Sequence, residues 1–261
     1  MFDDKINMVE RGNNMESVAS EEQAKQFIER NKGIANNEAS ACGDGRFTPD
    51  QSNGYVRLFG GDEGILMVLR GAANKLGIEI SNAELVARLG ASLRDIRSKD
   101  APIGIHTDEH SLHEEKIGCG HVARAISGEA KHENLTPEDV RALRVELPEE
   151  ALENQEVLEG DHQEKAVLLV HGLDWSVNSQ DAETGEMYFV VDVDRATDLI
   201  DKVVDGVGIS GLTKEEARHQ FESQMMATAK VLAHGKDIYG VNFDEDGNFT
   251  LKKEGVVPSN Q

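Results

Sequence analysis

The chain has 261 residues, 38% of them hydrophobic and 25 of them glycine, which is enough to bury a sizeable core without disulfide support. Its 49 acidic and 27 basic residues give a net charge of −22, which disfavours nucleic acids and anionic membranes as partners. The first residues lack the basic and apolar segments of a signal peptide, and no apolar run approaches the roughly 18 residues that span a bilayer. We therefore expect a cytoplasmic protein.

The first elements follow a polar tail, which we place at residues 1–20. Ser20 is placed to cap a helix that runs through Arg30, because a serine hydroxyl accepts from a free backbone N–H of the first turn. Residues 33–41 are too polar to predict a strand and lead Cys42 into a turn. The flanking Gly43 and Gly45 permit the backbone geometry that a tight metal loop needs.

Apolar periodicity predicts the next elements. Residues 55–59 alternate like a strand, and Asp62 is placed to cap a helix over 63–76. A second helix is expected over 82–89, and a short buried strand over 101–105. Two further helices are expected to begin after Cys119 and, with Thr136 as N-cap and Pro137 in the first turn, at 137.

The second half of the chain predicts strands alternating with helices. We expect strands over 165–170 and 187–192, helices over about 195–204 and 214–233, and a final hairpin of 238–243 and 249–252 turning at Asp246-Gly247. This alternation is typical of an α/β fold with a mainly parallel central sheet flanked by helices and an antiparallel edge. We expect residues 21–261 to form a single domain.

Two cysteines carry the chemistry. Cys42 opens the segment Cys-Gly-Asp-Gly-Arg, and Cys119 lies in Gly-Cys-Gly-His. One disulfide between them is the alternative, but a secreted scaffold of this size usually carries more cysteines, which favours thiols kept as metal ligands. Thiolate and imidazole are the ligands that zinc and its softer relatives select, and three protein ligands with one open position distinguish a catalytic zinc from a structural one.

A carboxylate and a guanidinium accompany the first thiol. Asp44 and Arg46 share one short loop with Cys42, so the arginine can fork onto the aspartate. That pairing keeps Asp44 ionised and placed to accept a proton from a water on the metal. A polar turn with a surface ion pair is the simpler interpretation of the same residues.

Histidines between the two cysteines offer the third ligand. His106 is expected to end a strand at the carboxyl edge of the sheet, where open α/β sheets place their sites. His110 and His113 follow in a loop, and His110 remains the rival to His106. His121 is expected in the first turn of the helix after Cys119, facing away from the metal.

The first motif resembles that of the carbonic anhydrases with a Cys-His-Cys metal site. Cys42, Asp44 and Arg46 match its Cys-x-Asp-x-Arg in full. The beta class continues with His-x-x-Cys, which this chain does not meet, because Lys116 stands three positions before Cys119. The zeta class, which uses cadmium or zinc, separates its histidine and second cysteine by a longer loop.

Two further segments are similar to the zeta class, namely residues 104–110 with 118–120, and residues 57–62. The resemblance implies a fold like that of the beta carbonic anhydrases and the reversible hydration of carbon dioxide to bicarbonate by a metal-bound hydroxide. It implies zinc or cadmium held by Cys42, His106 and Cys119, with Asp44 and Arg46 catalytic. In the closed form of that family the aspartate itself binds the metal until the arginine draws it away.

Two other functions remain open from the residues alone. A related enzyme could hydrolyse another small electrophile at the same metal, or the metal could be structural or sensory in a non-catalytic protein. Asp44 and Arg46 beside the metal favour catalysis, because a purely structural site more naturally uses a fourth protein ligand. The sequence leaves open whether the chain forms a homo-oligomer.

Overall fold

A computed structural model describes residues 19–33, 40–43, 56–97, 103–105, 119–148, 151, 164–233 and 236–256. The helices are α1 (Glu21–Arg30), α2 (Gly61–Lys75), α3 (Asn82–Arg97), α4 (Gly120–Ser127), α5 (Pro137–Val145), α7 (Val193–Val207) and α8 (Lys214–Leu232). The strands are β1 (Ser40–Cys42), β2 (Val56–Leu58), β3 (Glu164–His171), β4 (Met187–Asp192), β5 (Asp237–Phe243) and β6 (Phe249–Val256). The tail expected over residues 1–20 lies almost wholly outside the described residues.

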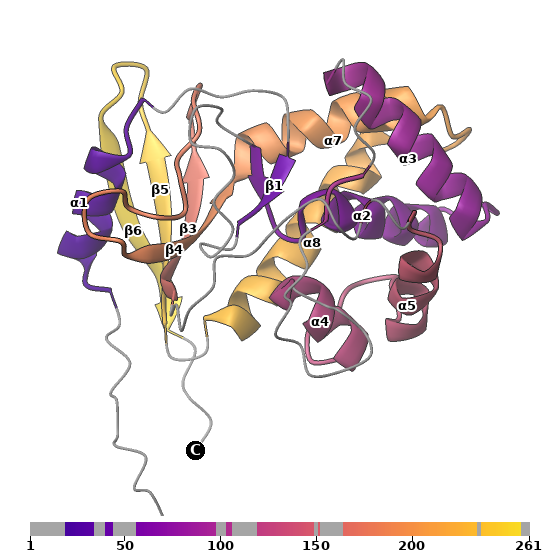
Figure 1. Ribbon diagram of the computed structural model, residues 1–261, viewed down its shortest axis with the longest axis horizontal. Helices are drawn as coiled ribbons and strands as arrows, with labels where there is room; N and C mark the ends of the chain where they lie inside the picture. The colour runs from indigo at the N-terminus through magenta and orange to yellow at the C-terminus, as the bar shows by residue number, and fades with distance from the viewer. Residues whose placement is uncertain are drawn as a thin grey trace, which may run out of the picture.

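The main sheet has four strands in the order β4-β3-β5-β6. Strands β4, β3 and β5 are parallel, and β6 returns antiparallel to β5 at the edge, with Gly247 in the left-handed conformation at the hairpin turn. A second sheet pairs β1 and β2 in parallel. The predicted α/β class with a mainly parallel sheet is confirmed, and the two short strands lie between the main sheet and the group of helices (Figure 1).

Alternate residues of the central strands divide the core into two layers. Leu168, Tyr188 and Val241 join α1 in a cluster on one face of the sheet. Leu169, one position from Leu168, and Val191, three positions from Tyr188, join the larger cluster that contains α7, α8 and both cysteines. Because successive strand residues point to opposite faces, the sheet is covered on both sides, as a parallel sheet requires.

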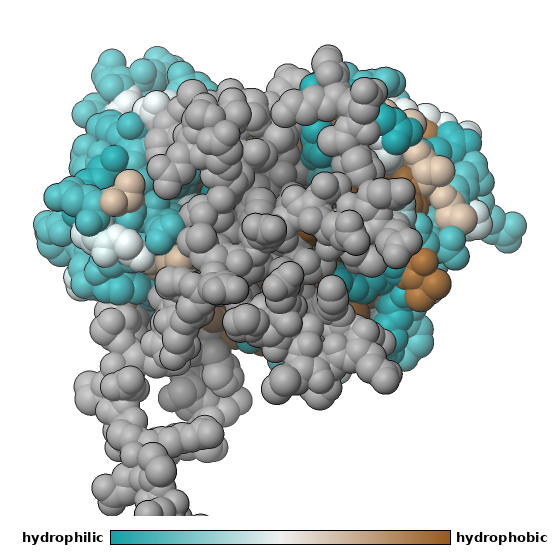
Figure 2. Space-filling model, in the orientation of Figure 1, coloured by the Kyte–Doolittle hydropathy of each residue, from teal (hydrophilic) through white to brown (hydrophobic). Residues whose placement is uncertain are grey.

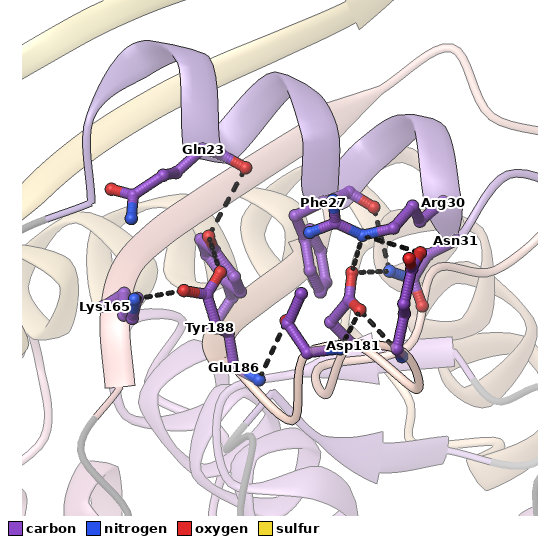
Figure 3. Close-up of polar contacts among 10 residues, drawn as sticks. Gln23, Phe27, Arg30, Asn31, Lys165, Asp181, Glu186 and Tyr188 are labelled. Atoms are coloured by element: carbon purple, nitrogen blue, oxygen red, sulfur yellow. Dashed lines mark hydrogen bonds and ion pairs between the residues drawn. The ribbon is translucent and has the colours of Figure 1, made fainter.

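Ion pairs and hydrogen bonds fix α1 to the segment between β3 and β4 (Figure 3). The Nε atom of Arg30 donates to Oδ2 of the buried Asp181 at 2.6 Å, and the other carboxylate oxygen accepts from two backbone N–H groups of the turn that follows. The Phe27 and Tyr188 rings pack with centroids 4.1 Å apart. The helix on this face is therefore bound to the sheet by both apolar and charge-assisted contacts.

Several predicted boundaries differ from the structure. Residues 40 and 41, in the segment judged too polar to predict a strand, form β1 together with Cys42, which was expected in a turn. The helix expected over 63–76 begins two residues earlier, so Asp62 lies inside its first turn and Gly60 is the N-cap. The helix expected over 82–89 continues to Arg97, and the described part of the expected strand, residues 103–105, is buried but is not in a strand.

The described surface on one side of the molecule is mainly hydrophilic, with scattered apolar residues over the helical part (Figure 2). Val145, the most exposed large apolar residue described, is 81% exposed. Among the helices in the described ranges, none is both long enough and apolar enough to cross a membrane.

Candidate metal centre

Cys42 ends β1 and is held through its backbone. It pairs with Leu58 of the parallel strand β2, and Nη1 of the buried Arg57 donates to its carbonyl oxygen at 2.8 Å. The next residue, Gly43, donates to the Leu58 carbonyl at 3.0 Å and accepts from the Val190 N–H at 3.1 Å. The thiol therefore belongs to a backbone segment fixed between β2 and the edge strand β4.

Gly43 is required by close approach. A Cβ atom at this position would lie 2.6 Å from the Val190 carbonyl oxygen and 2.8 Å from the Phe189 ring. Its φ angle lies outside the left-handed region, so the value of glycine here is space rather than unusual backbone geometry. Gly45, the other glycine that we expected to shape this turn, lies outside the described residues.

Cys119 is the N-cap of α4, and its carbonyl accepts from the Ala123 N–H at 2.9 Å. His121 lies in the first turn of this helix, as predicted. Its ring is buried, and its Nδ1 atom is 2.6 Å from the Thr228 hydroxyl of α8. Burial, with a smaller contribution from neighbouring His132, lowers the His121 pKa well below its ordinary value, so this ring is neutral at pH 7.

The two thiols meet although 77 positions separate them in the chain. Their sulfur atoms are 3.7 Å apart, both side chains are buried, and both cysteines are free. Two thiolates bound at about 2.3 Å to one tetrahedral zinc ion are separated by about 3.8 Å. The described donor set therefore fits two ligands of a tetrahedral metal ion.

The remaining predicted site residues, Asp44, Arg46, His106 and the rival His110, lie outside the described residues. Within the described ranges, no group of three or more His, Cys, Asp and Glu side chains could hold a metal ion. Residues 103–105, which lead directly to His106, are buried, and the Gly104 N–H donates to a carboxylate oxygen of Asp62 at 2.7 Å.

No protein-family model matches the chain, and no curated protein matches it. Among solved structures, the chain is similar to the cadmium-bound domain 2 of a carbonic anhydrase from the marine diatom Thalassiosira weissflogii, solved with acetate. The two are 17% identical with a TM-score of 0.44, and the alignment covers 80% of this chain and 93% of that one. A likeness at this level identifies neither the reaction nor the metal ligands, which rest on the residues of this chain.

The structure adds buried charged residues that the motifs did not identify. Arg57 holds the Cys42 carbonyl, and Asp62 and Glu63 lie buried in the first turn of α2, joined to Arg97 and Arg144 respectively. Charged residues are rarely fully buried unless they are paired, so burial itself would have indicated these ion pairs. The sequence alone does not show that these residues are buried.

Proposed function

We propose that this protein is a carbonic anhydrase, which converts carbon dioxide and water reversibly to bicarbonate and a proton. The observation that carries the proposal is the separation of 3.7 Å between the Cys42 and Cys119 sulfur atoms, which fits two thiolates on one tetrahedral zinc or cadmium ion. It is supported by the sequence that follows Cys42, because Asp44 and Arg46 add the carboxylate and guanidinium that such a reaction uses.

Three side chains would hold the metal. Cys42 and Cys119 provide two thiolates, and His106 provides an imidazole from the segment that follows the buried residues 103–105. When bound, the ion supplies an ionised water at neutral pH, which is the nucleophile that hydration requires. Three protein ligands leave one coordination position for that water.

Asp44 would accept a proton, and Arg46 would hold Asp44 away from the metal. The Asp44 carboxylate would accept the proton that the water releases, and the Arg46 guanidinium would fork onto Asp44 and keep it ionised. By holding the carboxylate, Arg46 would also keep Asp44 from binding the metal itself. Aromatic rings of the core lie close to the Cys42 segment, because Phe189 adjoins Gly43 and packs against Phe59 with centroids 4.7 Å apart.

Metal analysis combined with a hydration assay tests the proposal. The purified protein should contain about one equivalent of zinc or cadmium and should hydrate carbon dioxide between about pH 6 and pH 9, a range that brackets the pKa near 7 of a zinc-bound water. Cys42→Ser and Cys119→Ser are the controls. Each should lose the metal and the activity, because a serine hydroxyl is not ionised at neutral pH and is a poor ligand for a soft metal.

Two results would contradict the proposal. Native protein that contains no metal, or that contains a disulfide between Cys42 and Cys119, would exclude the metal site. Protein with bound metal that hydrates carbon dioxide no faster than buffer across this pH range would instead identify a non-catalytic, structural or sensory metal protein.

A further inference from the structure

Asp62 is a buried carboxylate that joins three segments of the chain. It lies in the first turn of α2 with no exposed surface, and Nη1 and Nη2 of Arg97, at the end of α3, donate to its two oxygens at 3.0 and 2.5 Å. Its Oδ2 atom also accepts from the Gly104 N–H at 2.7 Å. One side chain therefore fixes the described segment 103–105 against the two helices.

We propose that Asp62 is a positioning residue for the metal centre, which acts by holding Gly104 and so fixing where the chain enters His106. This inference rests on the proposed function, in which His106 is the imidazole ligand. Successive Cα atoms are about 3.8 Å apart, so two residues place the Cα of His106 within about 7.6 Å of the Cα of Gly104. A fixed Gly104 thereby restricts the positions from which the imidazole can reach the thiol pair.

The chemistry of the contact explains why a carboxylate is needed. Both oxygens of Asp62 accept hydrogen bonds, and the N–H of Gly104 together with the fork of Arg97 supplies only donors. In Asp62→Asn one acceptor becomes an NH2 group facing a donor, so one of these contacts is lost without a change in side-chain size. Burial removes the competition from water that weakens such contacts at a surface.

The neighbouring residue offers a matched control. Glu63 is also buried in the first turn of α2, and Nη1 of Arg144 on α5 donates to both of its oxygens at 2.9 Å. Glu63→Gln likewise removes a buried negative charge and weakens the contact that one nitrogen of Arg144 makes with both oxygens. The described partner of Glu63 lies on α5, whereas Asp62 holds the segment that enters His106. The two variants separate a general loss of stability from a specific effect on the imidazole.

The experiment measures zinc affinity and the ligand set of the full chain. Competition with a chelator should show zinc affinity reduced about 10- to 100-fold in Asp62→Asn, the range for outer partners of metal ligands, and nearly unchanged in Glu63→Gln. X-ray absorption should count two sulfur neighbours in every protein. The imidazole neighbour of wild-type protein should be lost or weakened only in Asp62→Asn.

A milder variant keeps the inference testable if Asp62→Asn does not fold. Arg97→Lys retains a positive charge but loses the two-pronged contact that orients the carboxylate, so it should weaken zinc binding in the same direction and to a smaller extent. Unchanged affinity and an intact imidazole signal in either variant, or an equal loss in Glu63→Gln, would overturn the inference and leave the proposed function standing. Wild-type protein without a zinc-bound imidazole would overturn the ligand assignment, and this inference with it.

Discussion

In the proposed function, Asp44 would distinguish an enzyme from a protein that only binds a metal. Asp44→Asn preserves the size of the side chain but removes the proton acceptor, so the variant should retain its metal and lose on the order of 100-fold or more in hydration rate, the scale of general acid-base catalysis. Metal content and stopped-flow rates measured on the same sample check this. Undiminished activity in the variant would remove Asp44 from the mechanism.

Two histidines compete for the third ligand position. His106 directly follows the buried segment 103–105, and His110 lies four residues further on. His106→Ala should therefore strip the metal or weaken its binding severely, whereas His110→Ala should leave the metal bound. Chelator competition on the two variants decides between them, and the reverse pattern would assign the ligand to His110.

At the scale of elements, the approach of β1 to β4, made through Gly43 directly after β1, positions the first thiol. In Gly43→Ala the added Cβ would meet the Val190 carbonyl at 2.6 Å, and neither backbone can yield without breaking the hydrogen bond between them. We expect a loss of about 1–3 kcal/mol in the free energy of unfolding, with weaker metal binding because Cys42 moves with its neighbour.

Gly90→Ala is the matched control for this substitution. Gly90 lies in α3, and an added Cβ would have its nearest neighbours at 3.9 Å, which is ordinary contact. Alanine is a better helix former than glycine, so this variant should be as stable as wild type or more stable by up to about 1 kcal/mol. Chemical denaturation of both variants measures the contrast, and equal effects would show that the approach of β1 to β4 is not critical.

Elements with a local signal could be predicted from the sequence. Ser20 and Thr136 cap α1 and α5 through capping boxes, and β4 has the predicted bounds because its apolar residues are buried on both faces. β1 carries no such signal, since its three residues form a strand only through pairing with β2. Asp62 shows the same limit. Its sequence neighbours predict a helix N-cap, whereas its contacts with Arg97 and Gly104 depend on segments that are distant in the sequence.

The candidate site was likewise predictable only where the sequence carries a local signal. The residue types and the two thiol motifs predict that Cys42 and Cys119 bind one metal, which stays a prediction. The structure places their sulfur atoms 3.7 Å apart. The contacts that hold Cys42 were not predictable, because the Arg57 side chain donates to the Cys42 carbonyl and Gly43 bonds to the backbone of Leu58 and Val190, all distant in the sequence. The ligand role of His106 and the roles of Asp44 and Arg46 stay predictions.

For the whole molecule, Asp192 makes stability depend on pH. Burial raises the pKa of this carboxyl, the N-cap of α7, from 3.8 to about 7. Because the folded state binds this proton more tightly than the unfolded chain, its contribution to stability is complete below about pH 4 and is lost as the pH rises towards 7. Asp192→Asn should match wild type near pH 4 and be more stable near pH 8, by on the order of 4 kcal/mol.

Other groups also make stability depend on pH, so the effect of Asp192 is measured as the difference between variant and wild type at each pH. Burial lowers the pKa of His132 to about 4, so its contribution to stability is lost as the pH falls below 6.5, opposite in sign to that of Asp192.

Burial also raises the pKa of Asp181, but hydrogen bonds from Arg30 and two backbone N–H groups outweigh it and leave that pKa below its ordinary value. Asp181→Asn should therefore destabilise the protein at neutral pH. For Asp192, the measurement is chemical denaturation across the pH range. The raised pKa would be contradicted if the difference in unfolding free energy between Asp192→Asn and wild type were the same at every pH.

If the two thiols, which lie 77 positions apart in the chain, bind one metal as proposed, that metal would also stabilise the fold. An ion bound to both would act as a crosslink that closes a long loop of chain, and such a crosslink restricts the unfolded ensemble. Ligands that bind only the folded state also raise its stability by mass action. A cell short of the metal would then lose the protein itself through faster proteolysis, so the supply of metal would set the abundance of the protein as well as its activity.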